Sequence, residues 1–435
     1  METKRLQVVT NPSTQIPESA PPLVTIPPSP NCEVCVIVPV RNEAQTLIAT
    51  LTALASQTEF TGEPLEESRY EIILLANNCN DNSAAIARDF ACQHPDLKLH
   101  VVEKTLSPQY AYIGYVRKIL MDEAYRRLRK FRRGVIASTD GDSQVSPTWI
   151  AANLHEIAGG ADAVGGRIIT DTAGRASLHP YAKACHLREV GYNYLVAELE
   201  TYLDPNPHDP FPRHYQHYGA SFAVTVQMYA RSGGMPLVRT PEDVAFYQAL
   251  MRVNARFRHS PLVQVVTSAR QNGRTNIGLA NQLQKWTTMG EENQPFLVES
   301  ADAIATRLQL RHQLRLLWSS ILSGYQPTQT DILPLAKTLK INAQWLIQEL
   351  SQPTTSGKLI EIVEQRQNQE GIWTQQWKPI EITQAIKDLR EYLAKLRRQN
   401  NQQDGWVRPS LPNQIASAMI PSTKLDKSAE ERVVV

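Results

Sequence analysis

Short apolar runs alternate with helical stretches over the first third of this chain, between Cys32 and Asp142. Continuous apolar runs of about four to eight residues are typical of strands buried on both faces, and the stretches between them have the spacing of covering helices. The pattern predicts a parallel α/β sheet flanked by helices. The expected strands are residues 34–40, 70–76, 97–103 and 135–138, and the expected helices are residues 42–57, 83–92 and 114–129.

Polar motifs follow three of these strands, and ligands bind α/β sheets at the carboxyl ends of strands. The motifs are Arg41-Asn42-Glu43, Asn77-Asn78 and Asp140-Gly141-Asp142. In the last of them, two carboxylates supply the oxygen ligands that Mg²⁺ or Mn²⁺ prefer, and the glycine lets a ligand approach the backbone closely. Two carboxylates do not fill the coordination shell of the cation, so water and a further group must complete it. Diphosphate is the usual further group.

The rest of the chain divides by composition. After Ser146-Pro147, strands are expected at residues 163–170, 221–226 and 264–267 and helices at 181–203 and 242–253. Beyond about residue 299, leucine and glutamine dominate at helical spacing, which predicts an all-helical extension. The expected divisions are a disordered proline-rich tail (1–31), an α/β domain (32–295, with halves meeting at 145/146), the helical extension (296–400) and a second disordered tail (401–435).

Composition excludes several classes of function. Hydrophobic residues make up 42% and charged residues 20% of the 435 residues, as in a globular protein in solution. A net charge of +2 does not favour wrapping by nucleic acid, and the helix-turn-helix-like stretch 331–350 lacks a basic recognition face. No run reaches the roughly 18 apolar residues of a membrane span, and no apolar signal core opens the chain. We therefore expect a cytoplasmic protein without an integral membrane segment.

The cysteines and histidines give weaker signals. The five cysteines are not a disulfide framework, and Cys32-x-x-Cys35 has no second pair to complete a zinc site, so buried thiols are expected. His214 and His217 would share a metal only on a helix, which the flanking prolines disfavour. His259 is at most an accessory ligand.

Taken together, the strand followed by PVRNE, the strand ending in NNCND, the third strand and helix, and the strand followed by TDGD resemble the nucleotide-binding half of family 2 glycosyltransferases, which have the GT-A fold. The stretch YGASFAV…GGMPLVRTPEDVAF is similar to the acceptor half of that family. The resemblance covers Cys32 to Trp286. It implies hexosyl transfer from a UDP- or GDP-sugar to an acceptor hydroxyl, with Mn²⁺ or Mg²⁺ and with inversion at the anomeric carbon.

The resemblance also assigns donor-side residues. It implies that Asp142 is the direct metal ligand and that Asp140 contacts the ribose or the metal's water. Asn78 stands where the family usually has an aspartate that reads the base, and its amide can still donate and accept. The local alternatives are that Glu43 only stabilises a helix dipole and that Asp81 only caps a helix. The full expected donor set is Pro39, Arg41, Glu43, Asn78, Asp81, Arg117, Asp140, Arg270 and Arg274.

On the acceptor side, the resemblance makes Asp243 the catalytic base, with Glu242 positioning the acceptor and Gly233-Gly234 contributing to its binding. The alternative is that both acids only satisfy a helix dipole. Two rival functions stay open. A sugar-phosphate nucleotidyltransferase would normally carry a glycine-rich basic loop, which PVRNEAQT lacks, and an inactive sugar-binding protein has little need of a base beside a metal site. The helical extension is expected to shape the acceptor side or an oligomer contact.

Overall fold

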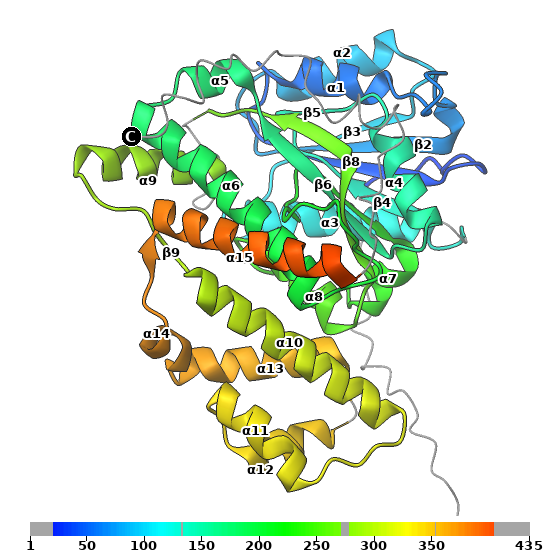
Figure 1. Ribbon diagram of the computed structural model, residues 1–435. Helices are drawn as coiled ribbons and strands as arrows, with labels where there is room; N and C mark the ends of the chain where they lie inside the picture. Colours follow the sequence, from blue (N-terminus) through cyan, green and yellow to red (C-terminus); the bar gives the residue numbers. More distant parts are fainter. Residues whose placement is uncertain (1–20, 132–133, 271–277, 353, 404–435) are drawn as a thin grey trace, which may run out of the picture. The chain divides into compact units, whose positions relative to one another are not determined.

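The computed structural model describes residues 21–131, 134–270, 278–352 and 354–403 (Figure 1). An eight-stranded sheet with the order β3-β2-β1-β4-β7-β6-β8-β5 forms its centre. Its first four strands are parallel, as predicted, and place their carboxyl ends along one edge. They are β1 (Val34–Val40), β2 (Tyr70–Asn77), β3 (Leu99–Lys104) and β4 (Val135–Ser138).

The other half of the sheet is mixed, which the sequence pattern did not predict. Antiparallel pairing joins β7 to both β4 and β6 and joins β5 to β8, whereas β6 and β8 are parallel. Strand β8 begins at Phe257 rather than at Gln264, because a register shift between Gly166 and Arg167 accommodates Pro261 in its middle. The strands are β5 (Ser143–Val145), β6 (Ala163–Thr170), β7 (Phe222–Thr225) and β8 (Phe257–Thr267).

Helices cover both faces of the sheet, as Figure 1 shows for α1, α2 and α3. Successive residues of a strand point to opposite faces, so Val36 and Val38 pack in one core while Cys35 and Ile37 pack in the other. The first core includes α1 (Leu47–Ala55), α2 (Ser83–Gln93) and α4 (Trp149–Ala158). The second includes α3 (Ile113–Leu128), α7 (Val226–Arg231) and α8 (Glu242–Arg252).

The expected helix start at Asn42 is wrong. Asn42 has the left-handed φ of 57°, and α1 begins only at Leu47 after a turn in which the Thr46 amide donates to the Glu43 carbonyl. Tertiary contacts decide this, because the Glu43 amide donates to Ser83 Oγ at 2.8 Å and the Glu43 carboxylate binds Arg270. The end of β1 is therefore a loop whose side chains face a site rather than a helix cap.

The segment before Cys32 is also better fixed than expected. Within the tail predicted to be disordered up to Asn31, Val24 is buried, and the amides of Leu23 and Val24 donate to Glu123 on α3. The Ile26 carbonyl accepts from Arg127 at 2.7 Å. Composition alone did not show that α3 offers a carboxylate and a guanidinium to this backbone.

The later helices continue the chain. Within the compact unit that ends at Ala394, α10, α11, α12 and α13 share a core of their own. Arg252 of α8 is paired with Glu361 of α13, and Arg315 of α10 is paired with Asp204. Two residues each from β9 (Leu297–Val298) and β10 (Ile380–Glu381) form a small sheet. The helices are α5 (Thr172–Ala176), α6 (Pro180–Leu203), α9 (Leu279–Glu291), α10 (Ala301–Leu322), α11 (Gln329–Leu339), α12 (Ala343–Leu350), α13 (Ser356–Gln369), α14 (Ile372–Gln376) and α15 (Ile382–Gln403).

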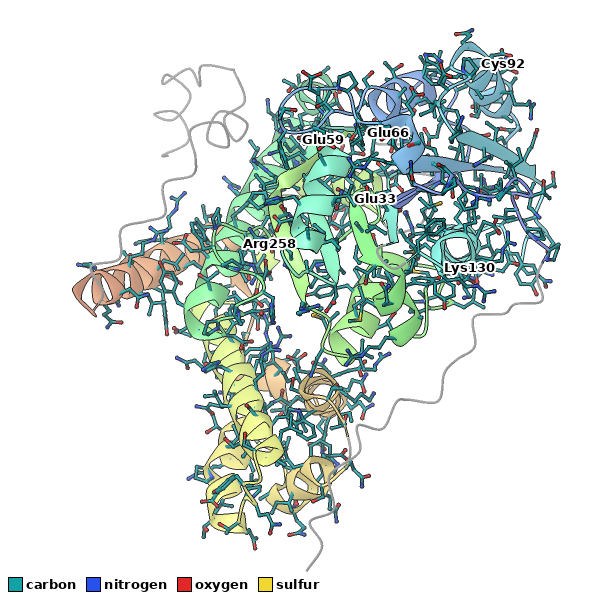
Figure 2. All side chains as sticks on the ribbon, turned by 90° about the vertical axis from the view of Figure 1, so that its right-hand side faces the viewer. Glu33, Glu59, Glu66, Cys92, Lys130 and Arg258 are labelled. Atoms are coloured by element: carbon teal, nitrogen blue, oxygen red, sulfur yellow. The ribbon has the colours of Figure 1, made fainter. Side chains whose placement is uncertain are left out.

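Cys32 and Cys35 are the buried thiols that the sequence predicted. Both are free, and burial raises the pKa of Cys32 to about 12, so these groups are inert. Cys92 is exposed at the surface of α2 (Figure 2). In the four described ranges of the chain, no helix has both the length and the hydropathy to span a bilayer.

Candidate active site

The Asp140-Gly141-Asp142 motif forms a turn after β4 in which the Ser143 amide donates to the Asp140 carbonyl at 3.1 Å. Gly141 packs against the end of β1, where an added Cβ would lie 3.0 Å from Val40 Cγ2. Its carbonyl accepts from Thr50 Oγ1 at 3.1 Å, which fixes the turn to α1. The motif therefore stands beside the end of β1, as the parallel strand order requires.

Glu43, Asp142 and Arg270 form an ion-pair cluster at this edge. The Arg270 guanidinium binds both oxygens of the buried Glu43 carboxylate, one of them at 2.6 Å from Nη2, and lies 3.1 Å from Asp142 Oδ2. Residues that are 227 apart in the sequence are thus in direct contact. Arg274, the second arginine expected here, lies outside the described residues.

Asp142 is in a place with an excess of negative charge. Burial raises its pKa and so do the charges of Asp140 and Glu43, which together outweigh Arg270 and bring the pKa to about 6. A divalent cation would relieve this excess, and carboxylate oxygens are the ligands that Mg²⁺ and Mn²⁺ take. Among the residues described, no group of three His, Cys, Asp or Glu side chains is assembled as a metal site, so Asp140 and Asp142 would need oxygens from a ligand. With such additional oxygens, the carboxylates of Asp140 and Asp142 would suit a hard cation.

Arg117 connects the two halves of the site. It extends from α3 with a side chain only 5% exposed, and its Nη2 donates to Asp140 Oδ1 at 2.9 Å while its Nε donates to Glu242 Oε1 at 3.1 Å. Nη1 donates to Ser138 Oγ and to the Gly219 carbonyl at 3.1 Å. Burial lowers the pKa of Arg117, but the charges of Asp140, Glu242 and Asp243 raise it above its ordinary value. The guanidinium therefore remains charged between the acids.

Glu242 and Asp243 begin α8 and have different surroundings. Glu242 is buried against Arg117, and burial raises its pKa although Arg117 opposes the shift. Asp243 is half-buried, and its Oδ2 accepts from the Gly219 amide at 2.9 Å. Gly219 also contacts Arg117, so Arg117 lies between Asp140 and the acidic pair at the start of α8. The structure gathers the following predicted residues around Arg117 and Arg270: Glu43, Asp140, Asp142, Glu242 and Asp243.

The other expected donor residues lie at the ends of β1 and β2, and most of their polar atoms have protein partners. Asn78, with φ of 51°, donates to and accepts from the Leu106 main chain. Asp81 accepts from Ser83 and from the Ala44 amide, so it fixes the start of α2 to the loop after β1, although the N-cap position itself is Asn82. Arg41 donates to the Ala111 carbonyl at 3.2 Å, and Pro39 is part of β1 opposite Leu75.

Gly233 and Gly234 form a left-handed turn after α7, with φ of 85° and 76°. Gly234 packs on the ring of Tyr229, whose hydroxyl donates to Asp122 and accepts from the Met235 amide. The segment then passes α3, where Gly114 leaves room for the Val238 carbonyl, since a Cβ would lie 1.8 Å from that oxygen. This glycine pair therefore directs the chain toward the start of α8.

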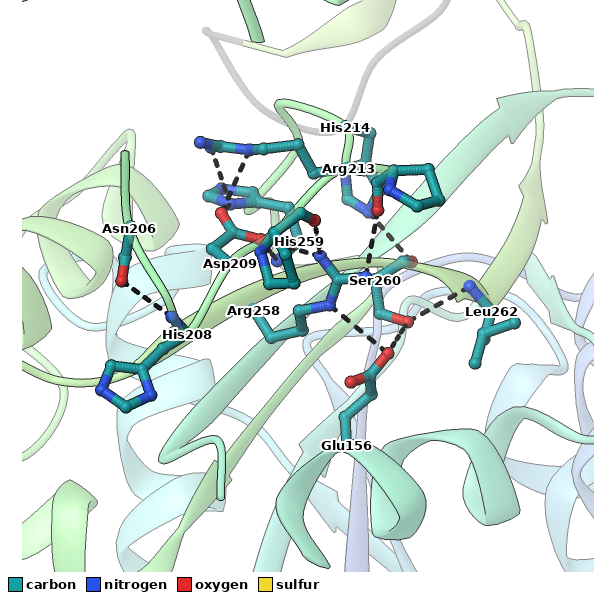
Figure 3. Close-up of polar contacts among 12 residues, drawn as sticks. Glu156, Asn206, His208, Asp209, Arg213, His214, Arg258, His259, Ser260 and Leu262 are labelled. Atoms are coloured by element: carbon teal, nitrogen blue, oxygen red, sulfur yellow. Dashed lines mark hydrogen bonds and ion pairs between the residues drawn. The ribbon is translucent and has the colours of Figure 1, made fainter. Parts of the chain in front are cut away.

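Sequence reasoning missed a buried ionic network on β8, drawn in Figure 3. Asp209 contacts His259 Nδ1 at 2.7 Å, Arg213 Nε at 3.1 Å and Arg258 Nη1 at 3.1 Å. Arg213 is also paired with Glu200 at 3.1 Å. Nothing in the sequences DPFPRHYQH and FRHSP indicated that their charged residues would be in contact. They are in contact because the 204–221 loop crosses β8.

His214 and His217, which the sequence did not favour as metal ligands, make other contacts. His214 Nε2 contacts the Ser260 carbonyl at 3.1 Å, and its Nδ1 accepts from the Gln216 amide. His217 stacks on Tyr247 of α8, with ring centroids 3.9 Å apart. These contacts make the network a support under the loop that carries Gly219.

We expect Asp209→Asn to lower the free energy of unfolding by about 3 to 5 kcal/mol, because it removes the buried counter-charge that Arg213 and Arg258 share. Burial raises the pKa of Asp209, but His259 and Arg213 hold it below its usual range. The stabilisation is thus present above the unfolded pKa of about 3.9 and is lost as the pH falls below it. Urea denaturation at pH 7 measures the loss. Asp162→Asn, which removes the more exposed ion pair with Arg256, should cost about 0 to 1 kcal/mol, and equal costs would contradict the expectation.

A family model described as glycosyl transferase family 2 matches residues 35–212. The matched range contains β1, β2, β3 and β4 together with Glu43, Arg117 and the Asp140-Gly141-Asp142 turn. Residues 35–212 belong to glycosyl transferase family 2. The predicted family is thus confirmed for this part of the chain, which carries a glycosyltransferase domain, whereas Gly219, Glu242, Asp243 and Arg270 lie beyond the match.

The chain also has a curated relative. Glycosyltransferase AglE of Haloferax volcanii is 29% identical over 136 residues, which are 31% of this chain and 39% of AglE. The chain thus spans about two fifths of the length of the relative it matches.

Two solved structures resemble the chain over most of its length. They are mannosyltransferase PcManGT from Pyrobaculum calidifontis in complex with GDP-Man and Mn²⁺ (17% identity, 89% of this chain and 90% of that one, TM-score 0.39) and S. aureus TarS 1–349 in complex with UDP (11%, 88% and 95%, 0.38). At these TM-scores neither likeness supports a conclusion about this chain.

Proposed function

We propose that the protein is a metal-dependent, inverting glycosyltransferase that moves a sugar from a nucleotide-sugar donor to an acceptor hydroxyl. The observation that carries the proposal is the meeting of Asp140 and Glu242 on one guanidinium, with Asp243 beside it. A donor site at the sheet edge and a carboxylate poised for an acceptor are what such a transfer needs in one place. The family match supplies the reaction class.

On the donor side, Asp142 and Asp140 would hold a divalent cation. When bound, the cation supplies positive charge that neutralises the departing nucleoside diphosphate. Arg270 already lies at Asp142, and its planar guanidinium suits bidentate contact with phosphate oxygens. Pro39, Arg41, Asn78 and Asp81 border the strand ends where the nucleoside would lie.

On the acceptor side, Asp243 accepts the proton of the incoming hydroxyl. Each of its oxygens already accepts one backbone amide, from Gly219 and Val244, and each keeps a lone pair for that proton. The acceptor oxygen bonds to the anomeric carbon as the bond to the diphosphate breaks on the opposite face, which inverts the configuration. Glu242 is held by Arg117, so it supports this geometry rather than exchanging protons.

Thermal melting with UDP, GDP and ADP, each with and without Mn²⁺, tests the proposal. At least one of these nucleotides should raise the melting temperature only when the metal is present, because a ligand of the folded state stabilises it by mass action. Slow Mn²⁺-dependent hydrolysis of the matching nucleotide sugar should accompany the shift. Melting curves that do not move with any nucleotide would remove the proposal.

A further inference from the structure

We propose that Arg117 and Gly219 form a bridge that positions Asp243 against the nucleotide-binding end of β4. The inference rests on the proposed function and adds two positioning residues to it, one of which the sequence did not suggest. In this assignment Arg117 does not contact the donor. Its role is to hold the two carboxylate groups of the site in one arrangement.

The first observation is how Arg117 uses its donors. One guanidinium contacts Asp140 through Nη2, Glu242 through Nε, and Ser138 and Gly219 through Nη1. These hydrogen bonds use all three nitrogens of the planar guanidinium, whose donors point in fixed directions. A lysine ammonium donates from a single nitrogen and cannot reproduce them. With a side chain 5% exposed, Arg117 has little freedom to turn to a diphosphate, whereas Arg270 is 27% exposed.

The second observation is that a single residue continues the connection to the base. The Gly219 carbonyl accepts from Arg117 Nη1 at 3.1 Å and from Ser138 Oγ at 2.9 Å, and its amide donates to Asp243 Oδ2 at 2.9 Å. A Cβ at this position would lie 2.4 Å from Arg117 Cζ. The guanidinium therefore occupies the space where any side chain at residue 219 would begin.

These contacts form a continuous path from the donor side to the base. Asp140 is 34% exposed and keeps an oxygen for a ligand while it holds Arg117 with the other. A displacement of the guanidinium by an added methyl group would move Gly219 and with it the hydrogen bond to Asp243. A shift of about 1 Å in a catalytic group can cost about 100-fold in rate. The bridge predicts a loss in turnover without a matching loss in nucleotide affinity.

Two variants and a matched control test the bridge. Gly219→Ala inserts a methyl group against the guanidinium. The double variant Arg117→Met/Glu242→Gln removes the buried ion pair as a unit. Asp140 loses its guanidinium partner but is 34% exposed, so no fully buried charge is left unpaired, and this variant decides the test if Gly219→Ala does not fold. Gly191→Ala is the control, because nothing lies within 4 Å of a Cβ at that helical position.

The measurements are kcat for Mn²⁺-dependent hydrolysis of UDP-glucose or GDP-mannose and the calorimetric Kd of UDP or GDP with Mn²⁺. We expect kcat to fall about 100-fold in both bridge variants while Kd stays near that of the unaltered protein. Wild-type kcat in either folded bridge variant, or parallel losses in kcat and affinity, would overturn the bridge. If the unaltered protein neither binds nor hydrolyses any nucleotide sugar with metal, the proposed function itself fails, and the bridge fails with it.

Discussion

Replacing Asp142 by asparagine should raise the thermal stability of the metal-free protein at pH 7 and abolish metal-dependent nucleotide binding. The two effects have the same cause, since this half-buried carboxylate lies near the charges of Asp140 and Glu43 with only partial compensation by Arg270. A carboxylate with neighbouring negative charges is destabilising unless a cation neutralises them. If Asp142 binds the metal directly, as we propose, its loss should weaken nucleotide binding with Mn²⁺ by about 100-fold or more.

The sign of the stability effect follows from the pKa. At about 6 the folded pKa of Asp142 exceeds the unfolded value near 3.9, so the native state binds more protons and loses stability as the pH rises between these values. A shift of about two pKa units corresponds to at most about 3 kcal/mol. Asp142→Asn removes this cost. The melting temperature of the variant should therefore equal that of the unaltered protein below pH 4, exceed it increasingly from pH 4 to pH 6, and exceed it fully above pH 6.

Calorimetry with UDP or GDP and Mn²⁺, together with melting curves at pH 4 and pH 7, checks both effects. Asp162→Asn is the control, because it removes an ion-paired aspartate away from the site. It should bind nucleotide normally. An undiminished Mn²⁺-dependent heat in Asp142→Asn would contradict the metal role of this residue.

Asp243→Asn should leave donor binding intact and lower kcat by about 10² to 10⁴, the usual contribution of a general base. An asparagine oxygen can still accept from the Gly219 amide, so the contact to the bridge should hold while the proton acceptor and the bond from the Val244 amide are lost. This separates the base from the alternative of a helix-dipole acid, in which only stability would change.

A matched control exists for that alternative. Asp302 lies in the first turn of α10, as Asp243 does in α8, and Asp302→Asn should alter stability slightly and turnover not at all. Steady-state hydrolysis of the nucleotide sugar that stabilises the protein gives kcat, and calorimetry gives the nucleotide Kd. Turnover equal to that of the unaltered protein in Asp243→Asn would remove its assignment as base.

Much of the nucleotide-binding half could be read from the sequence because its strands are continuous apolar runs with neighbouring helices. The predicted strands 34–40 and 135–138 match β1 and β4 in both bounds. The mixed half was harder, since β5 has only three residues and Pro261 interrupts β8. Short or interrupted strands lack the periodicity on which such a prediction depends.

Buried ion pairs also show what the local sequence pattern cannot predict. Glu71 lies in the apolar strand YEIILLAN and is paired with Arg127 of α3, a contact between residues 56 apart. The strand was predictable and its partner was not. The same holds for Asp209, whose partners His259 and Arg258 come from a strand about 50 residues later.

The sequence by itself determined the strand-end positions of Glu43, Asn78 and Asp142, because parallel strands align their carboxyl ends whatever follows them. Only the tertiary structure decided that Arg117 faces Asp140 and Glu242 and that Gly219 meets both Arg117 and Asp243. Two of those contacts join α3 to α8 and to the loop before β7 across more than 100 residues of sequence. No local periodicity records them, because they are set by how the two halves of the sheet pack around one buried charge.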